Sequence, residues 1–389
     1  MLLVNAQPLG PQSGFSLQLR SFFSGWPSHK LAQIYSTTSE PDTNVCRNNY
    51  RLQQDQNSSS QSLWKKYRFK VCGYQISKEL AEWIRNFRPD AVFSELEDTH
   101  ISKLVVDISK LFKIPVIPHI CDDWIQFQSE SIKALWGNRI RKYCFYWTLR
   151  KAPIRLVTSD SMAVEYRRRY GYEFFPFSYC IDPATYEPTQ DARIGQSLVR
   201  FIYAGRPQGS RWQTLKHLLK AADEIAQLKK IELVIATDKG DIHEENELNR
   251  PWIRVVNYIK TEQEFADLLH SADIGVIAEG YNPSWVTYSR YSFSAKIPVY
   301  MMSGCCILGL GPRHLSTMRY IIENDCGIVI SSTDPGVIRQ ELDHLLDLPG
   351  KIKQYGSRGK EVALRNHNIH TVQPSFMNLI TDALARENR

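Results

Sequence analysis

The sequence predicts an α/β protein built from two doubly wound, Rossmann-like domains that face each other across a cleft. The length of 389 residues exceeds one ordinary hydrophobic core. Short apolar strands alternate with amphipathic helices, which is typical of parallel sheets covered on both faces. The alternation pauses at a polar, proline-bearing stretch, 178–192, and then restarts. We therefore expect an N-terminal domain over 1–182, a C-terminal domain over 193–370, and a last helix, 371–389, that packs back on the N-terminal domain.

The first half opens with a strand, a glycine loop and a helix. Residues 2–4 are apolar, Gly10 to Gly14 form the loop, and 15–23 have helical spacing. This is how a βαβ unit begins. The loop is either a tight turn or a ligand contact, with Gly14 as the donor-binding candidate. The remaining elements expected here are strands at 31–35, 91–93, 114–117, 155–158 and 174–177, and helices at 76–87 and 101–112.

The second half repeats the pattern. Strands are expected at 199–203, 232–236, 253–256, 274–277, 305–308 and 327–330, and helices at 212–228, 262–269, 296–303, 315–323, 337–346, 352–364 and 372–385. Two such domains in series place a ligand cleft at the carboxyl ends of their strands.

Composition limits the class of protein. With 43% hydrophobic and 23% charged residues the chain is ordinary globular material. The eight cysteines lack metal-ligand spacing, and several lie in apolar runs, which favours a reducing compartment. The first residues do not resemble a signal peptide, and no apolar run approaches the roughly 18 residues of a membrane span. We therefore expect a cytoplasmic protein.

The net charge of +7 has one local source. The stretch 131–155 has no acidic residue and seven basic ones: Lys133, Arg139, Arg141, Lys142, Arg150, Lys151 and Arg155. The rest of the chain is therefore nearly neutral, which argues against a nucleic-acid partner. Aromatic residues interleave with these cations, as in helices that lie on an anionic membrane surface. A core helix with a solvated basic face explains the pattern equally well, so peripheral attachment to the inner face of a membrane is one of two interpretations.

A candidate phosphate site lies in the second half. Ser292, Phe293, Ser294 and Ala295 form a loop, a short apolar helix starts at Lys296, and Gly304 ends it. Outward backbone N–H groups at the start of a helix, together with its dipole, suit a phosphate. Lys296 would add a cation, or would only extend its charged end to solvent.

Two further groups of polar residues follow buried strands. Arg206 and Arg211 come directly after strand 199–203, where guanidinium groups can bind a diphosphate, or can simply be solvated. His119, Asp122 and Asp123 follow strand 114–117, where a histidine oriented by a carboxylate can act as a base or hydrogen-bond a sugar. A buried histidine can equally be structural. The Asp pair has no further clustered ligands, so we expect no metal and no cofactor.

These residues together resemble the large family of retaining glycosyltransferases with the GT-B fold, which includes glycogen synthase-like and sucrose synthase-like enzymes. The resemblance covers nearly the whole chain and rests on 201–206 with Arg211, on 272–276, and on 294–308. It implies metal-independent transfer, with retention, from a nucleotide diphosphate sugar to a glycan or lipid-linked acceptor. It also implies that Arg206 and Arg211 bind the diphosphate, that 292–295 holds the phosphates and the sugar, and that His119 contacts that sugar.

One departure from the family pattern keeps other functions open. The family has two glutamates eight positions apart, where this chain has Tyr291 and Val299. The second glutamate normally holds the nucleotide ribose. A nucleotide-sugar epimerase on the same fold would need acid–base carboxylates, for which Asp122, Asp123, Glu95 and Glu97 are the candidates. A non-catalytic binding protein that kept the fold is the third possibility.

Overall fold

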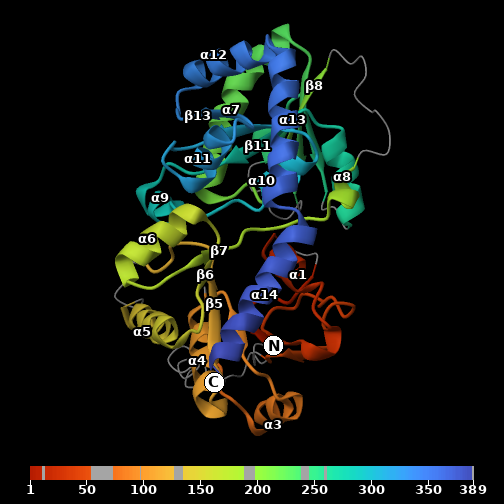
Figure 1. The fold of residues 1–389 in the computed structure, drawn as a ribbon. Coiled ribbons are helices and arrows are strands. Elements are labelled where there is room, and N and C mark those ends of the chain that lie inside the picture. The colour runs from red at the N-terminus through yellow and green to blue at the C-terminus, as the bar shows by residue number, and fades with distance from the viewer. Residues whose placement is uncertain are drawn as a thin grey trace. The chain divides into compact units, whose positions relative to one another are not determined.

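The computed structural model describes residues 1–10, 14–53, 73–96, 98–126, 135–187, 198–237, 245–257 and 261–387. The chain divides into two compact units (Figure 1). Unit 1 contains Met1–Ser178 and Val372–Arg389, and unit 2 contains Tyr179–Thr371.

Unit 1 is a Rossmann-like domain with a seven-stranded parallel sheet in the order β3-β2-β1-β4-β5-β6-β7. Its strands are β1 Leu2–Val4, β2 Ala32–Tyr35, β3 Asn48–Arg51, β4 Val92–Ser94, β5 Val116–Ile120, β6 Leu156–Val157 and β7 Phe175–Pro176. Its helices are α1 Gly14–Phe23, η1 Ser28–Lys30, α3 Lys78–Phe87, α4 Thr99–Phe112, α5 Leu135–Lys151 and α6 Asp160–Tyr170.

Side-chain caps fix where several of these helices begin. Ser77, Asp98 and Ser159 each accept a hydrogen bond from a backbone N–H of the first turn of α3, α4 and α6. Caps satisfy backbone donors that have no partner inside the helix.

An aromatic cluster forms the core on one face of the first sheet. Phe22 stacks on Phe376 of the last helix, α14 (Ile369–Glu387), at a centroid distance of 4.7 Å. Phe23, Phe93 and Phe177 contact the same Phe376 ring edge-on. In Figure 1 the N-terminal half of α14, which carries Phe376, accordingly lies beside α1. Phe376 of α14 thus completes this aromatic core of unit 1.

Unit 2 has a six-stranded parallel sheet in the order β10-β9-β8-β11-β12-β13. Its strands are β8 Val199–Ala204, β9 Ile231–Ala236, β10 Ile253–Val256, β11 Ile274–Ala278, β12 Cys306–Leu310 and β13 Gly327–Ile330. Its helices are η3 Pro183–Tyr186, α7 Gly209–Leu228, η5 Glu245–Leu248, α8 Glu262–His270, α9 Pro283–Ser289, α10 Lys296–Met302, α11 Ser316–Glu323, α12 Pro335–Leu346 and α13 Pro349–Asn366.

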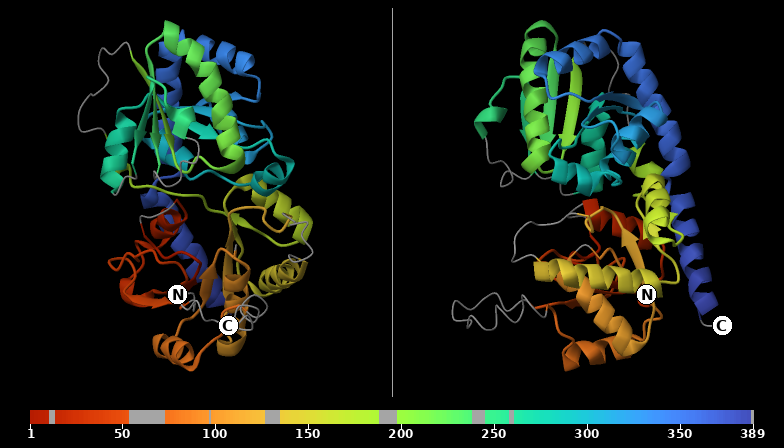
Figure 2. Two further views of the ribbon diagram at one scale, coloured as in Figure 1. Left: turned by 180° about the vertical axis from the view of Figure 1, so that it is seen from behind. Right: turned by 90° about the vertical axis from the view of Figure 1, so that its left-hand side faces the viewer.

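Helices cover both faces of this second sheet. The two views of Figure 2 show α7 and α13 on opposite sides of the strands. One apolar cluster contains side chains of α7, α12 and the central strands, among them Leu215, Leu233 and Leu308. The predicted fold class of two parallel-sheet, Rossmann-like domains is confirmed.

The described helices include none that is long and apolar enough to cross a membrane. The elements not expected from the sequence include strand β3, which has the polar sequence NNYR at the sheet edge, and helix α6, which follows β6. They also include α9, a seven-residue helix that precedes the predicted loop 292–295.

Candidate functional site

The carboxyl edge of the second sheet gathers charged residues from three elements. Arg211 lies in the first turn of α7, Glu279 is the first residue after β11, and Lys296 begins α10. Strands β8 and β11 are neighbours and parallel, so the segments that leave them meet at one edge. This is the edge at which ligands bind in open α/β sheets.

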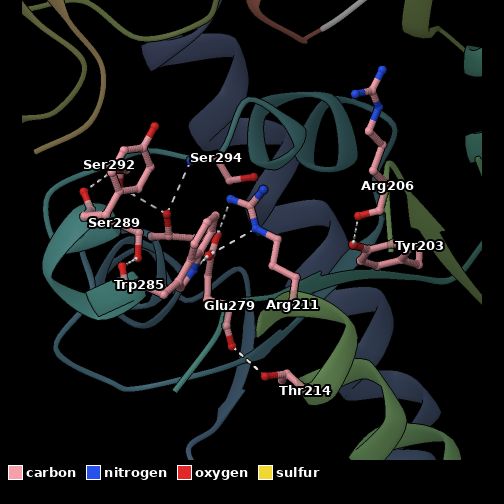
Figure 3. Close-up of polar contacts among 11 residues, drawn as sticks. Tyr203, Arg206, Arg211, Thr214, Glu279, Trp285, Ser289, Ser292 and Ser294 are labelled. Atoms are coloured by element: carbon pink, nitrogen blue, oxygen red, sulfur yellow. Dashed lines mark hydrogen bonds and ion pairs between the residues drawn. The ribbon is translucent and has the colours of Figure 1, made fainter. Parts of the chain in front are cut away.

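A buried carboxylate fixes the direction of Arg211 (Figure 3). Glu279 is only 4% exposed. Arg211 donates to its two carboxylate oxygens, from Nη2 to Oε1 at 3.2 Å and from Nε to Oε2 at 3.3 Å, and Trp285 Nε1 donates to Oε2 at 3.1 Å. The Arg211 guanidinium also lies 4.8 Å from the centre of the Trp285 ring. A guanidinium carries five N–H donors, so this geometry is compatible with holding a phosphate as well.

Backbone contacts also fix the positions of α7 and the end of β11, which carry Arg211 and Glu279. Thr214 Oγ1 donates to the Glu279 main-chain oxygen at 2.8 Å, which joins α7 to the end of β11. A Cβ added to Gly280 would lie 1.8 Å from Ser210 Oγ, so only glycine allows this close approach of the two segments. The position of Arg211 relative to Glu279 is therefore set by the fold.

Lys296 lies against the turn that follows β8. Its Nζ is 4.9 Å from the centre of the Tyr203 ring. A Cβ added to Gly205 (φ 122°) would come within 3.0 Å of Lys296 Cε and Nζ. Burial, and secondly the charge of Arg211, lower the pKa of Lys296 to about 7, against an opposing effect of Glu279. Lys296 can therefore gain or lose its charge near neutral pH.

Residues of α11 and His367, which directly follows α13, contact the loop 292–295 and fix its conformation. The Ser294 N–H donates to Thr317 Oγ1 at 3.3 Å, and Thr317 Oγ1 lies 3.2 Å from the main-chain oxygen of Ser292, to which it donates. Phe293 stacks on the His367 ring at 5.5 Å and meets Tyr320 edge-on at 4.9 Å. The loop conformation is thus fixed by side chains far away in the sequence.

Outward-pointing N–H groups were expected in this loop, but two of them donate to other groups of the protein instead. The Ser292 N–H donates to the Ser289 main-chain oxygen at 3.1 Å, and the Ser294 N–H is bound by Thr317. Helix α10 has only seven residues, and Ala295 gives it no side-chain cap. The charged side chains, rather than the dipole of α10, therefore provide most of the attraction for an anion at this edge.

The positions of the two family glutamates carry no carboxylate here. Val299 is 4% exposed and lies among the buried residues of α10. Tyr291 is partly buried, and its ring lies 5.6 Å from the Arg290 guanidinium. Glu279, before the loop rather than in it, is the carboxylate that the structure places beside Arg211.

The structure separates the two predicted arginines. Arg206 is exposed, and its main-chain oxygen accepts a hydrogen bond from the buried Tyr203 hydroxyl at 3.3 Å. In Figure 3 its side chain extends away from Arg211 and Glu279. Arg211 and Lys296 belong to one cluster, whereas Arg206 lies at its margin.

In unit 1, His119 lies in β5 and is fully buried. Its Nε2 is 3.0 Å from the Phe177 main-chain oxygen, and its Nδ1 is 3.6 Å from Glu95 Oε1 and 3.7 Å from Cys121 Sγ. Glu95 and Cys121 are thus the immediate polar neighbours of the predicted histidine, and neither aspartate is among the partners of its ring.

The two aspartates lie in different environments. Asp123 is 1% exposed and accepts hydrogen bonds from Tyr166 Oη at 2.9 Å and Arg169 Nη1 at 2.8 Å. Burial raises its pKa, and Arg169 opposes that effect. Asp123 therefore joins α6 to the end of β5, and Asp122 is partly exposed beside it.

Of the remaining predicted positions, Gly14 is the exposed first residue of α1, while 11–13 and Glu97 lie outside the described residues. Sequence reasoning missed Glu279, Trp285 and Thr317. For Glu279 a signal existed, because an acidic residue directly follows a fully apolar strand at the ligand-binding edge. Trp285 and Thr317 had no such signal, since tertiary packing alone brings them to the site.

Comparison with known proteins identifies the fold. No family model matches the sequence, and no curated protein matches it. Among solved structures, sucrose-phosphate synthase from Thermosynechococcus elongatus is similar with a TM-score of 0.72 at 15% identity, covering 99% of each chain. Anabaena Alr3699/HepE in complex with UDP-glucose has a TM-score of 0.68 at 11% identity, covering 98% of this chain and 99% of that chain. WaaG, a glycosyltransferase of lipopolysaccharide biosynthesis, has a TM-score of 0.67 at 10% identity, covering 98% and 100%. The chain therefore has the fold of the GT-B glycosyltransferases.

Proposed function

We propose that this protein is a glycosyltransferase whose donor is a nucleoside diphosphate sugar. The observation that carries the proposal is Arg211, held by buried Glu279 beside Lys296, at the carboxyl edge of the second sheet. Similar solved structures of the same fold are glycosyltransferases, and HepE was solved with UDP and with UDP-glucose. A diphosphate is the chemical group that this pair of cations fits best.

In the proposed chemistry the cations act on the leaving group. Breaking the bond between sugar and phosphate leaves negative charge on the departing diphosphate. Arg211, charged Lys296 and Arg206 from the margin offset that charge, so no metal is required. The Ser292–Ala295 segment contacts the phosphates and the sugar. Transfer proceeds with retention, the acceptor attacking on the face of the departing phosphate, which takes the acceptor's proton.

We give His119, Asp122 and Asp123 no direct part in this chemistry. The His119 ring is fully buried and its Nε2 contacts the Phe177 carbonyl, while Asp123 is bound by Tyr166 and Arg169. The same engagement of Asp123 removes the main support for an epimerase, which would need a carboxylate able to exchange protons with the sugar.

Thermal unfolding against a panel of nucleoside diphosphates and their sugars tests the proposal. A donor at one hundred times its Kd adds about 2.7 kcal/mol of apparent stability. Arg211→Met should abolish most of that shift. The matched control Arg319→Met, which removes an exposed arginine paired with Glu323, should keep it. Turnover is then measured as release of free nucleoside diphosphate. The proposal fails if no member of the panel shifts the transition, or if Arg211→Met responds like the control.

Buried Val299 favours one second candidate, a binding protein with the same fold and little or no turnover. It lacks the polar group that holds the ribose in the family pattern. A ligand-induced shift in stability without release of nucleoside diphosphate, for any acceptor glycan tried, would support this candidate over the transferase.

For the acceptor we propose a glycan or lipid-linked sugar reached at an anionic membrane surface. The exposed residues Arg139, Lys142, Tyr143, Tyr146 and Arg150 of α5 follow the i, i+3, i+4, i+7, i+11 spacing of one helix face. Cations and tyrosines on one face suit an anionic lipid surface. Arg141 is not part of this face, because it is partly buried over the Trp124 ring. Residues 131–134 of the basic stretch lie outside the described residues.

Vesicle sedimentation tests this surface. Replacing Arg139, Lys142 and Arg150 by glutamine should weaken binding to anionic vesicles, by about 1 kcal/mol per charge. Replacing Lys351, Arg358 and Lys360 of α13 by glutamine removes the same charge elsewhere and should change binding much less. Equal loss in the two triple variants, or none in the first, would count against the assignment.

A further inference from the structure

The carboxyl edge of the first sheet carries a compact group of three ligand-type side chains. Glu95 is the first residue after β4, His119 lies in β5, and Cys121 is the first residue after β5. One ligand atom from each lies within 4.8 Å of the other two. Glu95 is 3% exposed and His119 fully buried, while Cys121 is partly exposed and gives the group a side toward solvent.

The strand geometry explains why these residues meet. β4 and β5 are parallel neighbours, and Ser94 pairs with Pro118, so Glu95 comes beside His119. His119 and Cys121 are two residues apart in extended backbone and therefore share a face. The rings of Phe22 and Phe93 lie 5.4 and 6.1 Å from the His119 ring and limit its movement. The three side chains are thus presented together by rigid elements.

The partner of Nε2 determines what His119 offers the other two side chains. The Phe177 main-chain oxygen, 3.0 Å away, can only accept, so Nε2 carries the proton. In the neutral ring Nδ1 then presents its lone pair toward Glu95 Oε1 and Cys121 Sγ. Nitrogen, oxygen and sulfur lone pairs therefore converge on one small volume.

This arrangement does not suit a nucleophilic relay. Such a relay needs the thiol on one ring nitrogen and the carboxylate on the other, so that a proton can pass across the ring. Here both face Nδ1, and a backbone carbonyl occupies Nε2. The Nδ1 nitrogen with an oxygen and a sulfur atom beside it forms a set of metal-ligand atoms instead.

We propose that Glu95, His119 and Cys121 bind a divalent cation of the zinc type, through Oε1, Nδ1 and Sγ. Tetrahedral zinc, with bonds of about 2.3 Å to sulfur and about 2.0 Å to nitrogen and oxygen, holds nitrogen about 3.5 Å from sulfur and about 3.3 Å from oxygen. The corresponding separations here are 3.7 and 3.6 Å, so shifts of a few tenths of an ångström bring sulfur and oxygen to these distances from the nitrogen. The carboxylate oxygen and the sulfur lie within 4.8 Å of each other, and rotation of the Glu95 and Cys121 side chains would bring them closer when the cation binds. Nitrogen and sulfur ligands disfavour Mg²⁺ and Ca²⁺.

The surrounding hydrogen bonds also fit a metal site. Metal-binding histidines commonly donate their second N–H to a backbone carbonyl, as His119 does to Phe177. The Gln18 amide lies 3.9 Å from Cys121 Sγ and donates toward it, which would stabilise a thiolate. Asn5 Oδ1 accepts from the Glu95 backbone N–H at 3.0 Å and holds that residue in place. Binding deprotonates the Cys121 thiol and releases its proton to solvent.

The test uses untagged, reduced, full-length protein freed of metal. Zn²⁺ affinity is measured by competition with a chromophoric chelator, and Co²⁺ is added separately to look for thiolate charge-transfer absorption. The wild-type chain should bind one Zn²⁺ through this site. Cys121→Ala should weaken Zn²⁺ binding at least about 100-fold and remove the Co²⁺ charge-transfer band, and Glu95→Gln should weaken binding about 10- to 100-fold.

Cys46→Ala is the matched control, since Cys46 is a buried thiol of the same unit outside the group. It should bind both metals like the wild type, and circular dichroism of every variant shows that loss of binding is not loss of fold. The proposal is overturned if the wild-type chain does not hold Zn²⁺, or if Cys121→Ala holds it as tightly. Either result would make Glu95 and His119 a structural pair only.

Discussion

Replacing Arg211 by methionine should destabilise unit 2 through the carboxylate that remains. Glu279 is buried and its carboxylate is bound by Arg211 and Trp285. Methionine keeps most of the side-chain volume and removes the charge. The Glu279 carboxylate then keeps a hydrogen bond from Trp285 but loses its ion-pair partner. A buried charge without its partner destabilises the fold.

The size of the effect follows from burial. Breaking a fully buried ion pair costs about 3–5 kcal/mol. The Arg211 side chain is 36% exposed, so water screens part of the interaction and the expected loss is about 1–3 kcal/mol. For a unit of this length each kcal/mol lowers Tm by about 2–4 °C. A decrease of several degrees is therefore expected.

A double-mutant cycle in thermal and chemical unfolding separates this cause from lost packing. Glu279→Gln, added to Arg211→Met, removes the stranded charge and still accepts from Trp285. The double variant should recover at least half of the lost stability. Arg319→Met should change stability by less than about 0.5 kcal/mol, because its salt bridge is exposed. A double variant no more stable than Arg211→Met would refute this explanation.

Three further outcomes follow from the same structure. The pKa of Lys296 is about 7 in the folded protein, below the usual 10.5 of a lysine. Lys296 therefore loses its proton and its charge as the pH rises through 7, and the affinity for a donor sugar should fall over the same range. Calorimetry should show that fall in the wild type and a weaker, flat profile in Lys296→Met; parallel profiles would exclude this role. Gly275→Ala should lower the free energy of unfolding by about 1–3 kcal/mol, because the added Cβ would lie 2.3 Å from Cδ2 of buried Tyr300. The control Gly137→Ala, with open space around the added Cβ, should be neutral or slightly stabilising. Similar denaturation midpoints for the two variants would contradict this prediction. Phe293→Ala should remove two ring contacts of about 0.5–1.5 kcal/mol each and weaken donor binding, and Phe293→Leu should have an intermediate donor affinity. Unchanged donor affinity in Phe293→Ala would show that the loop conformation does not depend on Phe293.

The fold could be predicted from the sequence because its signals are local. Apolar runs such as 274–277 and amphipathic spacing such as 101–112 recur with short breaks, and the structure has β11 and α4 there. Strand β3 escaped because its residues, Asn48–Arg51, are polar. An edge strand with such side chains has no hydrophobic alternation to reveal it.

The candidate site was less predictable because its partners come from distant segments. The end of strand 199–203 indicated Arg211, and the start of a short helix indicated Lys296. Neither signal showed that Glu279 holds Arg211 and lies near Lys296. Asp123 was assigned chemistry from its position after β5, and only α6 shows that it binds Arg169. His119 was considered with its sequence neighbours, while Glu95, from the adjacent strand, is the carboxylate at its ring.

The position of Phe376 has a consequence for how the chain matures. Unit 2 is one continuous segment, whereas unit 1 is made of two segments that lie before and after unit 2 in the sequence. On a ribosome, unit 2 can fold as soon as it emerges. Phe22 and Phe23 must wait for Phe376, which is made only after the whole of unit 2. The usual N-terminal-first order is thereby reversed for the final step, and the first-made unit is the one that needs protection from aggregation during synthesis.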